Sequence, residues 1–174
     1  MGLLLSYILQ SELNEVENKR TVERLEVEAM TDVLTQLYNR RAWKKLVAAE
    51  EERCKLYGYS ASVLIIDLNG LKQVNDDDGH FAGDQLIQKT AQILKNNVRP
   101  QDVVARLGGD EFGILSIETT EFASKKLAQR ILAALNKENI SAAIGYAQRY
   151  ANCDLIDAIR QADQNMYQHK KQFK

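Results

Sequence analysis

The stretch of the chain that most constrains its fold is SASVLIID, at residues 60–67. Its unbroken apolar run, rich in β-branched residues, predicts a strand that is buried inside a sheet. Two further runs, at residues 103–107 and 111–116, flank the dipeptide Gly108-Gly109. Short apolar runs on either side of a glycine turn predict a β-hairpin. The sheet is therefore expected to contain both a hairpin and a buried strand.

The rest of the chain alternates between helical and extended patterns. Apolar residues at helical spacing predict helices, and one further apolar run predicts a strand. The helices are expected at 40–57, 84–97, 119–137 and 155–167, and the strand at 140–146. Residues 69–84 are rich in glycine and aspartate and predict a turn-rich connection. This order predicts a mixed α/β or α+β domain with helices flanking the sheet.

The N-terminal residues predict a helical extension before a single domain. The first ten are apolar but too short to span a membrane, which takes about 20. They fit a helix-packing stretch, the stub of a longer upstream segment, or an exposed end. Residues 11–30 predict one long helix, either pairing with itself or packed on its own domain, because a clean heptad pattern is missing. We expect an N-terminal helix over 1–30 and one domain over 31–174.

Composition excludes several classes of protein and site. Lys and Arg number 23 against 24 Asp and Glu, a net charge of −1, so no bulk field favours nucleic acid or an acidic membrane. We expect no nucleic-acid partner, and a membrane only if the N-terminal stub belongs to an upstream anchor. Cys54 and Cys153 form no CxxC pair, which excludes a cysteine zinc site and fits a reducing compartment. The expected location is the cytoplasm, free or as part of a membrane-tethered protein.

Three acidic residues are expected at one edge of the sheet. Asp67 ends the buried strand, and Asp110 and Glu111 follow the glycine turn. Carboxylates held by rigid strands suit Mg²⁺ or Mn²⁺, and Gly108 and Gly109 leave room for phosphates to approach the backbone. Taken alone, this pattern also fits an ordinary turn in a solvated loop.

A wider set of motifs resembles the GGDEF family, the diguanylate cyclases. The pentapeptide GGDEF at 108–112 is preceded by TDVLTQLYNRR at 31–41 and DLNGLKQVNDDDGHFAGD at 67–84, and ADQNMYQHK follows at 162–170. The last of these is similar to a closing helix that usually reads ADxALYxAK in the family. The resemblance covers residue 31 to the C-terminus and implies a polymerase-palm or nucleotidyl-cyclase fold, with a mixed sheet of about five strands.

The resemblance also implies a reaction. Two GTP molecules are joined into cyclic di-GMP with release of two pyrophosphates, across a homodimer whose protomers each hold one GTP. It implies two Mg²⁺ or Mn²⁺ ions per site. They would be held by Asp67, the backbone carbonyl of Leu68, Asp110 and Glu111. Glu111 is also a candidate for taking the proton of the 3′-hydroxyl.

Further site residues are implied by their positions in the motifs. Asn75 and Asp84 match the pair that reads guanine, and His80 lies between them. Lys72, Lys170 and Lys174 match positions near the phosphates, with Lys174 where the family usually has Arg. The roles implied are catalytic for Asp110, Glu111 and Lys72. They are substrate-binding for Asn75, His80, Asp84, Gly108, Gly109, Lys170 and Lys174.

A regulatory site is implied by Arg99 and Asp102, an RxxD pattern ahead of the GGDEF motif. At that offset it resembles the family's inhibitory site for its own product, with Arg130 as a second guanidinium supplied by another subunit. Taken alone, RxxD is also an ordinary surface ion pair. Arg106 has two interpretations, a phosphate contact or a structural ion pair.

The chain departs from the family pattern at three places. Asn69 replaces the second Asp of the DxD motif, Leu71 replaces a Phe, and the chain ends without the usual Gly-Arg-Asn stretch. The main alternative is therefore a weak or inactive GGDEF domain that binds GTP or cyclic di-GMP and regulates a partner. A second alternative is another nucleotidyl cyclase on the same fold, although the guanine pair argues against ATP.

Overall fold

The computed structural model describes residues 2–150 and 152–171, which divide into two compact units at residue 31. The first unit contains helix α1 (Gly2–Met30), so the predicted helix over 11–30 is present. It exposes apolar side chains, among them Leu13, Val16, Val22, Leu25 and Val27. None of the described helices is both long enough and apolar enough to traverse a lipid bilayer.

The second unit is built on an antiparallel sheet with the strand order β2-β3-β1-β4. Its strands are β1 (Ala61–Leu68), β2 (Val103–Arg106), β3 (Glu111–Ile117) and β4 (Ala142–Gln148). All eight residues of β1 are buried, as the apolar run predicts. The predicted hairpin is also present, as β2 and β3.

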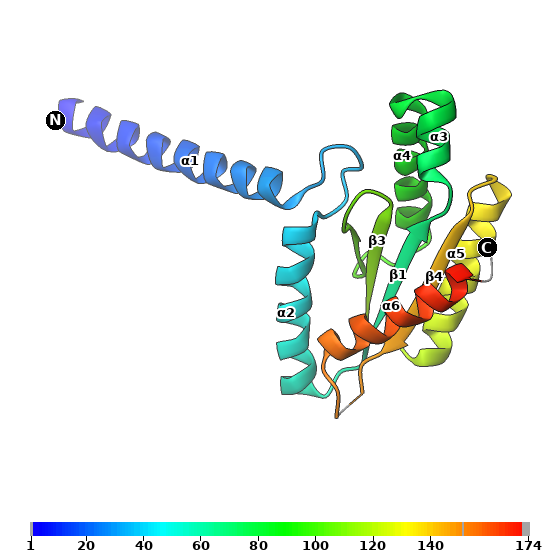
Figure 1. Ribbon diagram of the computed structural model, residues 1–174. Coiled ribbons are helices and arrows are strands. Elements are labelled where there is room, and N and C mark those ends of the chain that lie inside the picture. Colours follow the sequence, from blue (N-terminus) through cyan, green and yellow to red (C-terminus); the bar gives the residue numbers. More distant parts are fainter. Residues whose placement is uncertain (1, 151, 172–174) are drawn as a thin grey trace. The chain divides into compact units, whose positions relative to one another are not determined.

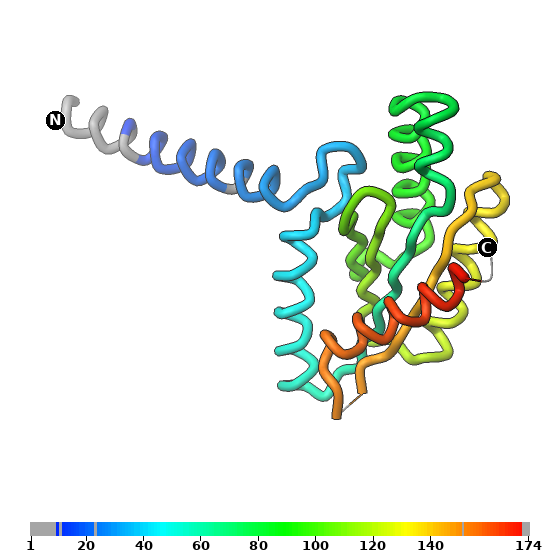
Figure 2. The backbone as a smooth tube through the Cα atoms, in the orientation of Figure 1, coloured from blue at the N-terminus to red at the C-terminus, as the bar shows by residue number. Residues whose placement is uncertain are grey.

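Helices cover both faces of the sheet (Figures 1 and 2). One face packs against α4 (His80–Asn96) and α5 (Glu121–Lys137), and the other against α2 (Arg40–Tyr57) and α6 (Leu155–Lys171). The side chains of Asn39 and Thr120 cap α2 and α5 by accepting hydrogen bonds from backbone amides. The predicted α+β class is therefore confirmed.

Two details differ from expectation. The turn-rich connection contains helix α3 (Leu71–Asp78) and the start of α4, because Gly70 and Gly79, both at positive φ, lie beside the helices rather than inside them. The described residues form four antiparallel strands rather than about five in a mixed sheet. A parallel pairing is present as an isolated bridge between Tyr38 and Ala105.

Helix α6 lies unusually close to β4 at Gly145. A Cβ atom built on Gly145 would come within 2.1 Å of both the Ala162 carbonyl oxygen and the Met166 nitrogen. Because the obstacles are backbone atoms, no side-chain rotation would make room for it. Gly145 thus sets how near α6 approaches the sheet.

Candidate active site at the hairpin end of the sheet

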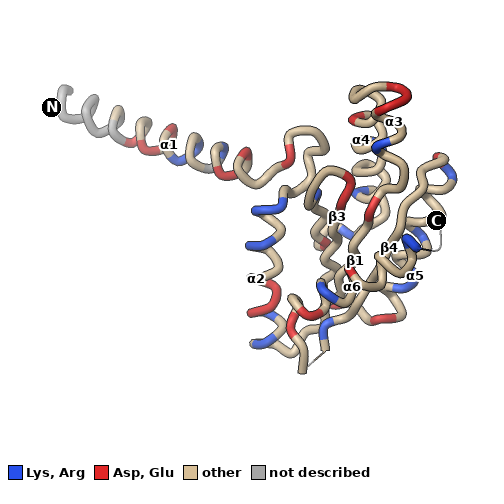
Figure 3. Tube along the Cα trace, viewed as in Figure 1, with Lys and Arg blue, Asp and Glu red and all other residues tan. Residues whose placement is uncertain are grey.

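The backbone brings the three predicted acidic residues to the same end of the sheet. Asp67 is paired in register with Glu111, and the Leu68 amide donates to the Asp110 carbonyl at 3.0 Å. The turn is closed by the Glu111 amide, which donates to Gly108 at 3.3 Å. Figure 3 shows acidic segments at the end of β1 and at the β2–β3 turn. The expected juxtaposition is therefore present in the backbone.

Asp67 is a buried carboxylate, and its one cationic partner among the described residues is a lysine. Its side chain is 10% exposed and forms an ion pair with Lys170 from the last turn of α6. Burial raises the pKa of Asp67, and the negative charge of Asp110 raises it further, while the hydrogen bond from Lys170 lowers it. The negative charges of Asp67 and Asp110 therefore lie close enough to interact, and a bound cation would stabilise both.

The donor set fits a hard divalent ion only in part. Among the described residues, no group of three or more His, Cys, Asp or Glu side chains is gathered closely enough to hold a metal ion. Asp67 and Asp110 do interact electrostatically, and Glu111 is paired with Asp67 across the strands. Mg²⁺ typically takes one or two carboxylates, with substrate phosphates and water completing its shell. The arrangement is compatible with that mode of binding.

The predicted guanine-reading residues lie on the two helices that follow β1. A Cβ atom on Gly83 would come within 1.9 Å of Asn75 Oδ1, so the absence of a side chain at Gly83 lets α4 approach Asn75 on α3. Asp84 follows Gly83 directly and is exposed, as are His80 and Lys72. These two helices pack on each other, which brings Asn75 against the α4 turn that precedes Asp84.

Asn69, the departure from the DxD motif, is bound to the loop before β4. Its side chain donates to Ser141 Oγ at 2.9 Å, and its backbone amide donates to the Ser141 carbonyl at 2.9 Å. The residue therefore fastens the end of β1 to the start of β4.

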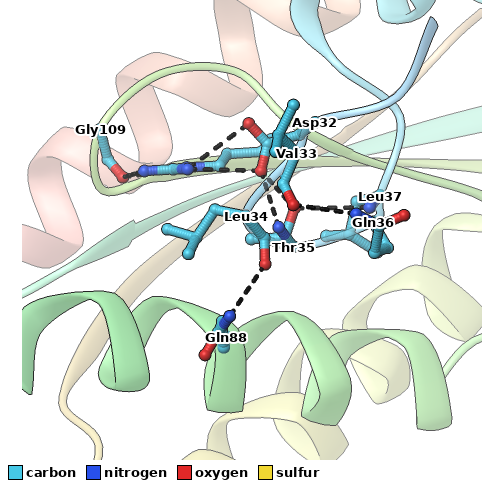
Figure 4. Close-up of polar contacts among 9 residues, drawn as sticks. Asp32, Val33, Leu34, Thr35, Gln36, Leu37, Gln88 and Gly109 are labelled. Carbon is cyan, nitrogen blue, oxygen red and sulfur yellow. Dashed lines mark hydrogen bonds and ion pairs between the residues drawn. The ribbon is translucent and has the colours of Figure 1, made fainter. Parts of the chain in front are cut away.

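Arg106 forms a structural ion pair, which is one of the two roles that the sequence suggested for it. Its guanidinium contacts Asp32 Oδ1 at 3.3 Å and donates to the Gly109 carbonyl at 2.9 Å. Burial acts to raise the pKa of Asp32, but hydrogen bonds from Thr35 and the charge of Arg106 outweigh it, so that pKa is lowered. Figure 4 shows these contacts, with Gln88 of α4 donating to the Leu34 carbonyl. The segment after residue 31 thus holds the hairpin turn.

The predicted inhibitory pair lies at the other end of the β2–β3 hairpin. Arg99 donates to both oxygens of Asp102, through Nε at 3.3 Å and Nη2 at 3.1 Å, and Asp102 also accepts from the Ile117 amide. Arg130 on α5 donates to the Asn97 carbonyl at 2.6 Å. Arg130 therefore contacts the chain two residues before Arg99. Lys174 lies outside the described residues.

Comparison with known proteins decides the family. The family model described as "Diguanylate cyclase, GGDEF domain" matches residues 29–174. This chain belongs to the GGDEF domain family. It is 36% identical over 150 residues to diguanylate cyclase DosC of Escherichia coli K12, covering 80% of this chain and 33% of that protein. It is 28% identical to diguanylate cyclase DgcS of Shewanella oneidensis, covering 91% of this chain and 55% of that protein.

Solved structures agree with this assignment. The GGDEF domain of TpbB (YfiN) from Pseudomonas aeruginosa superposes with a TM-score of 0.74 at 31% identity, covering 82% of this chain and 89% of that one. The coiled coil and GGDEF domain of DgcB from Caulobacter crescentus, solved with c-di-GMP, gives a TM-score of 0.87 at 24% identity. It covers 96% of this chain and 94% of that one. The present chain spans about a third of the length of DosC.

Two contacts of the site were missed by sequence reasoning. Lys170 was expected near phosphates, but its ion pair with Asp67 joins residues 103 positions apart, which no local pattern reveals. The ion pair between Asp32 and Arg106 likewise joins residues 74 positions apart. An acidic residue just before a turn, with an unassigned arginine beside the GGDEF motif, was the available signal.

Proposed function

We propose that this chain is a diguanylate cyclase domain that joins two GTP molecules into cyclic di-GMP and releases two pyrophosphates. The observation that carries the proposal is the convergence of Asp67, Asp110 and Glu111 with Lys170 at the hairpin end of the sheet, in a GGDEF-family chain. This arrangement supplies both the negative charge and the positive charge that phosphoryl transfer requires.

Each residue has a part in the proposed reaction. Asp67, Asp110, Glu111 and the Leu68 carbonyl would hold Mg²⁺ or Mn²⁺, two ions per site, which supply Lewis-acid stabilisation of the phosphate oxygens. Lys170 and Lys72 would contact phosphates, and Gly108 and Gly109 would let them approach the backbone. Asp84 would accept from guanine N1–H and the exocyclic amine, with Asn75 and His80 completing the pocket.

The reaction requires two protomers. The 3′-hydroxyl of each GTP would attack the α-phosphorus of the other, pyrophosphate would leave, and Glu111 is the candidate for taking the hydroxyl proton. Because each chain would hold one GTP, two copies must face each other about a two-fold axis. The exposed apolar side chains of α1 support a role for that helix as the dimerising element.

We further propose that the product inhibits the enzyme at Arg99, Asp102 and Arg130. A planar guanidinium can bind both guanine and phosphate, and Asp102 already holds Arg99 in one orientation through two hydrogen bonds. Bound cyclic di-GMP would contact the guanidinium groups of Arg99 and Arg130.

The proposal is tested by a turnover assay over a range of protein concentrations. Purified chain is incubated with GTP and Mg²⁺, and the product is identified by mass. Cyclic di-GMP formed at a rate that rises more steeply than protein concentration supports a dimeric cyclase, and Asp110→Asn serves as the inactive control. Tight binding of GTP or cyclic di-GMP by calorimetry, without turnover at any concentration, would replace this proposal with a binding module.

A further inference from the structure

Helix α6 supplies hydrogen-bond partners to the free edge of the sheet. Strand β4 is at one end of the strand order, so every second residue has backbone groups that face away from β1. Asn165 Nδ2 donates to the Tyr146 carbonyl at 3.0 Å, and the Ile144 amide donates to His169 Nδ1 at 3.0 Å. Two side chains of α6 therefore pair with two outward-facing groups of β4.

These two residues are one helical turn apart and thus lie on the same side of α6. Both stand where the closing-helix motif ADxALYxAK has alanine, which can make neither bond. The bonds are a feature of this chain rather than of the motif. They join α6 to β4 immediately before Lys170, whose ammonium group faces Asp67.

The contacts along α6 form a series that ends at the site. Gly145 brings the helix backbone against the strand, Asn165 holds the strand beside it, and His169 holds it one turn further on. Ile144 is paired with Ile66, the residue before Asp67. His169 therefore fixes the last turn of α6 directly beside the strand that carries the buried carboxylate.

We propose that Asn165 and His169 are positioning residues that set the last turn of α6 so that Lys170 faces Asp67 and the incoming phosphates. This inference rests on the proposed cyclase function for its effect on turnover, but not for its effect on Lys170 itself. His169 acts through an unprotonated Nδ1, because only that form accepts from the Ile144 amide. An asparagine at the same position carries an acceptor oxygen at a similar distance from the backbone.

The orientation of Lys170 is measured by amine labelling with mass spectrometry, using the neighbouring exposed Lys171 as the internal reference. Lys170 is 32% exposed and paired in the wild-type chain, so it should label slowly relative to Lys171. Loss of one neutral hydrogen bond should raise the relative labelling of Lys170 about fivefold in His169→Ala and in Asn165→Ala. His169→Asn should restore slow labelling, and Gln168→Ala, an exposed position on the same helix, should leave it unchanged.

Loss of folding does not mask the outcome, because alanine is the best helix former and melting temperatures identify any variant that unfolds. Equal labelling ratios in the wild type, His169→Ala and Asn165→Ala would overturn the proposal. Faster labelling in Gln168→Ala as well would also overturn it, because the effect would then be a general loosening of α6.

A double-mutant cycle separates positioning from general stabilisation. His169→Ala should lower kcat/KM for GTP about fivefold when Lys170 is present and should have no further effect in Lys170→Met. Equal losses in both backgrounds would show that His169 acts independently of Lys170 and would overturn the proposal. If the wild-type chain fails to turn over GTP, the cyclase function is wrong, and the labelling experiment still decides the role of Asn165 and His169.

Discussion

Two buried carboxylates contact opposite ends of α6 and have opposite electrostatic environments. Glu51 on α2 accepts from Arg149 Nε at 2.9 Å and Nη2 at 3.0 Å, and from the Leu155 amide at 2.8 Å. The hydrogen bonds from Arg149 lower the pKa of Glu51, whereas burial raises the pKa of Asp67. Glu51 has three donors at the start of the helix, and Asp67 is paired with one lysine of the described residues at its end.

The difference separates a structural carboxylate from one that can bind a ligand. A buried charge with several fixed donors gains nothing from an added cation, because its lone pairs are already used. A buried charge whose described cationic partner is one partly exposed ammonium group can exchange that partner for another cation. The same helix thus stabilises the fold at its N-terminal end and serves the site at its C-terminal end.

Asp67→Asn should give the largest effect. The change keeps the shape of the side chain and removes the charge that the proposed metal ions need, so cyclic di-GMP synthesis should fall about 10³-fold or more. Thermal stability should change little, because the buried charge that is removed carries a desolvation cost and its partner Lys170, 32% exposed, stays accessible to water. Initial rates and melting curves on the same samples measure both. An active Asp67→Asn would show that this carboxylate is not part of the site.

Glu51→Gln should give the reverse pattern. Removing one member of a buried ion pair leaves Arg149 without its counterion, and we expect a loss of about 3 kcal/mol in unfolding free energy. Turnover per folded molecule should stay near that of the wild type. Urea unfolding monitored by circular dichroism gives the free energy, and Glu52→Gln on the exposed side of α2 is the matched control. A stable but inactive Glu51→Gln would remove the distinction between the two carboxylates.

The acid dependence of stability should follow from Glu51. Its folded-state pKa lies below the ordinary value, so its ionised form stabilises the fold above that ordinary value. This contribution is lost as the pH falls from the unfolded pKa through the folded pKa. The stability gap between the wild type and Glu51→Gln should therefore narrow as the pH falls below about 4.5. Urea midpoints at successive pH values test this, and a constant gap would contradict it.

Arg99→Ala should give the smallest effect on the fold. Its ion pair with Asp102 is half-exposed on the arginine side, and the buried Asp102 keeps its hydrogen bonds from the Ile117 and Arg99 backbone amides, so we expect a loss of about 1 kcal/mol in stability. We expect inhibition by added cyclic di-GMP to weaken about tenfold or more while the initial rate stays largely intact. Unchanged inhibition would show that the Arg99–Asp102 ion pair takes no part in binding the product.

Much of the fold was predictable because its signals are local. The apolar run before Asp67 and the glycine turn before Asp110 give a strand and a hairpin from adjacent residues alone. Helix α3 was missed because glycines on both sides of a short polar segment resemble a loop, and only the packing of Gly83 against Asn75 shows that a helix fits there.

The contacts that tune the site could not be predicted in the same way. The partners of Asp67, Glu51 and Asp32 are distant in sequence, and each pair depends on how helices and turns pack on the sheet. Motif spacing identified which residues gather at the hairpin end. It carried no information about which carboxylate has a complete set of donors.

The missing side chain at Gly145 has a consequence for how this domain can vary. Even alanine there would force α6 off the sheet, and the displacement would disturb the donor network of Glu51 and the lysine beside Asp67 together. In a saturation library of the domain, position 145 should accept no substitution, although its own atoms take no part in chemistry. Because position 145 carries a hydrogen atom instead of a methyl group, the stability of the fold and the proposed activity depend on the same close contact between α6 and β4.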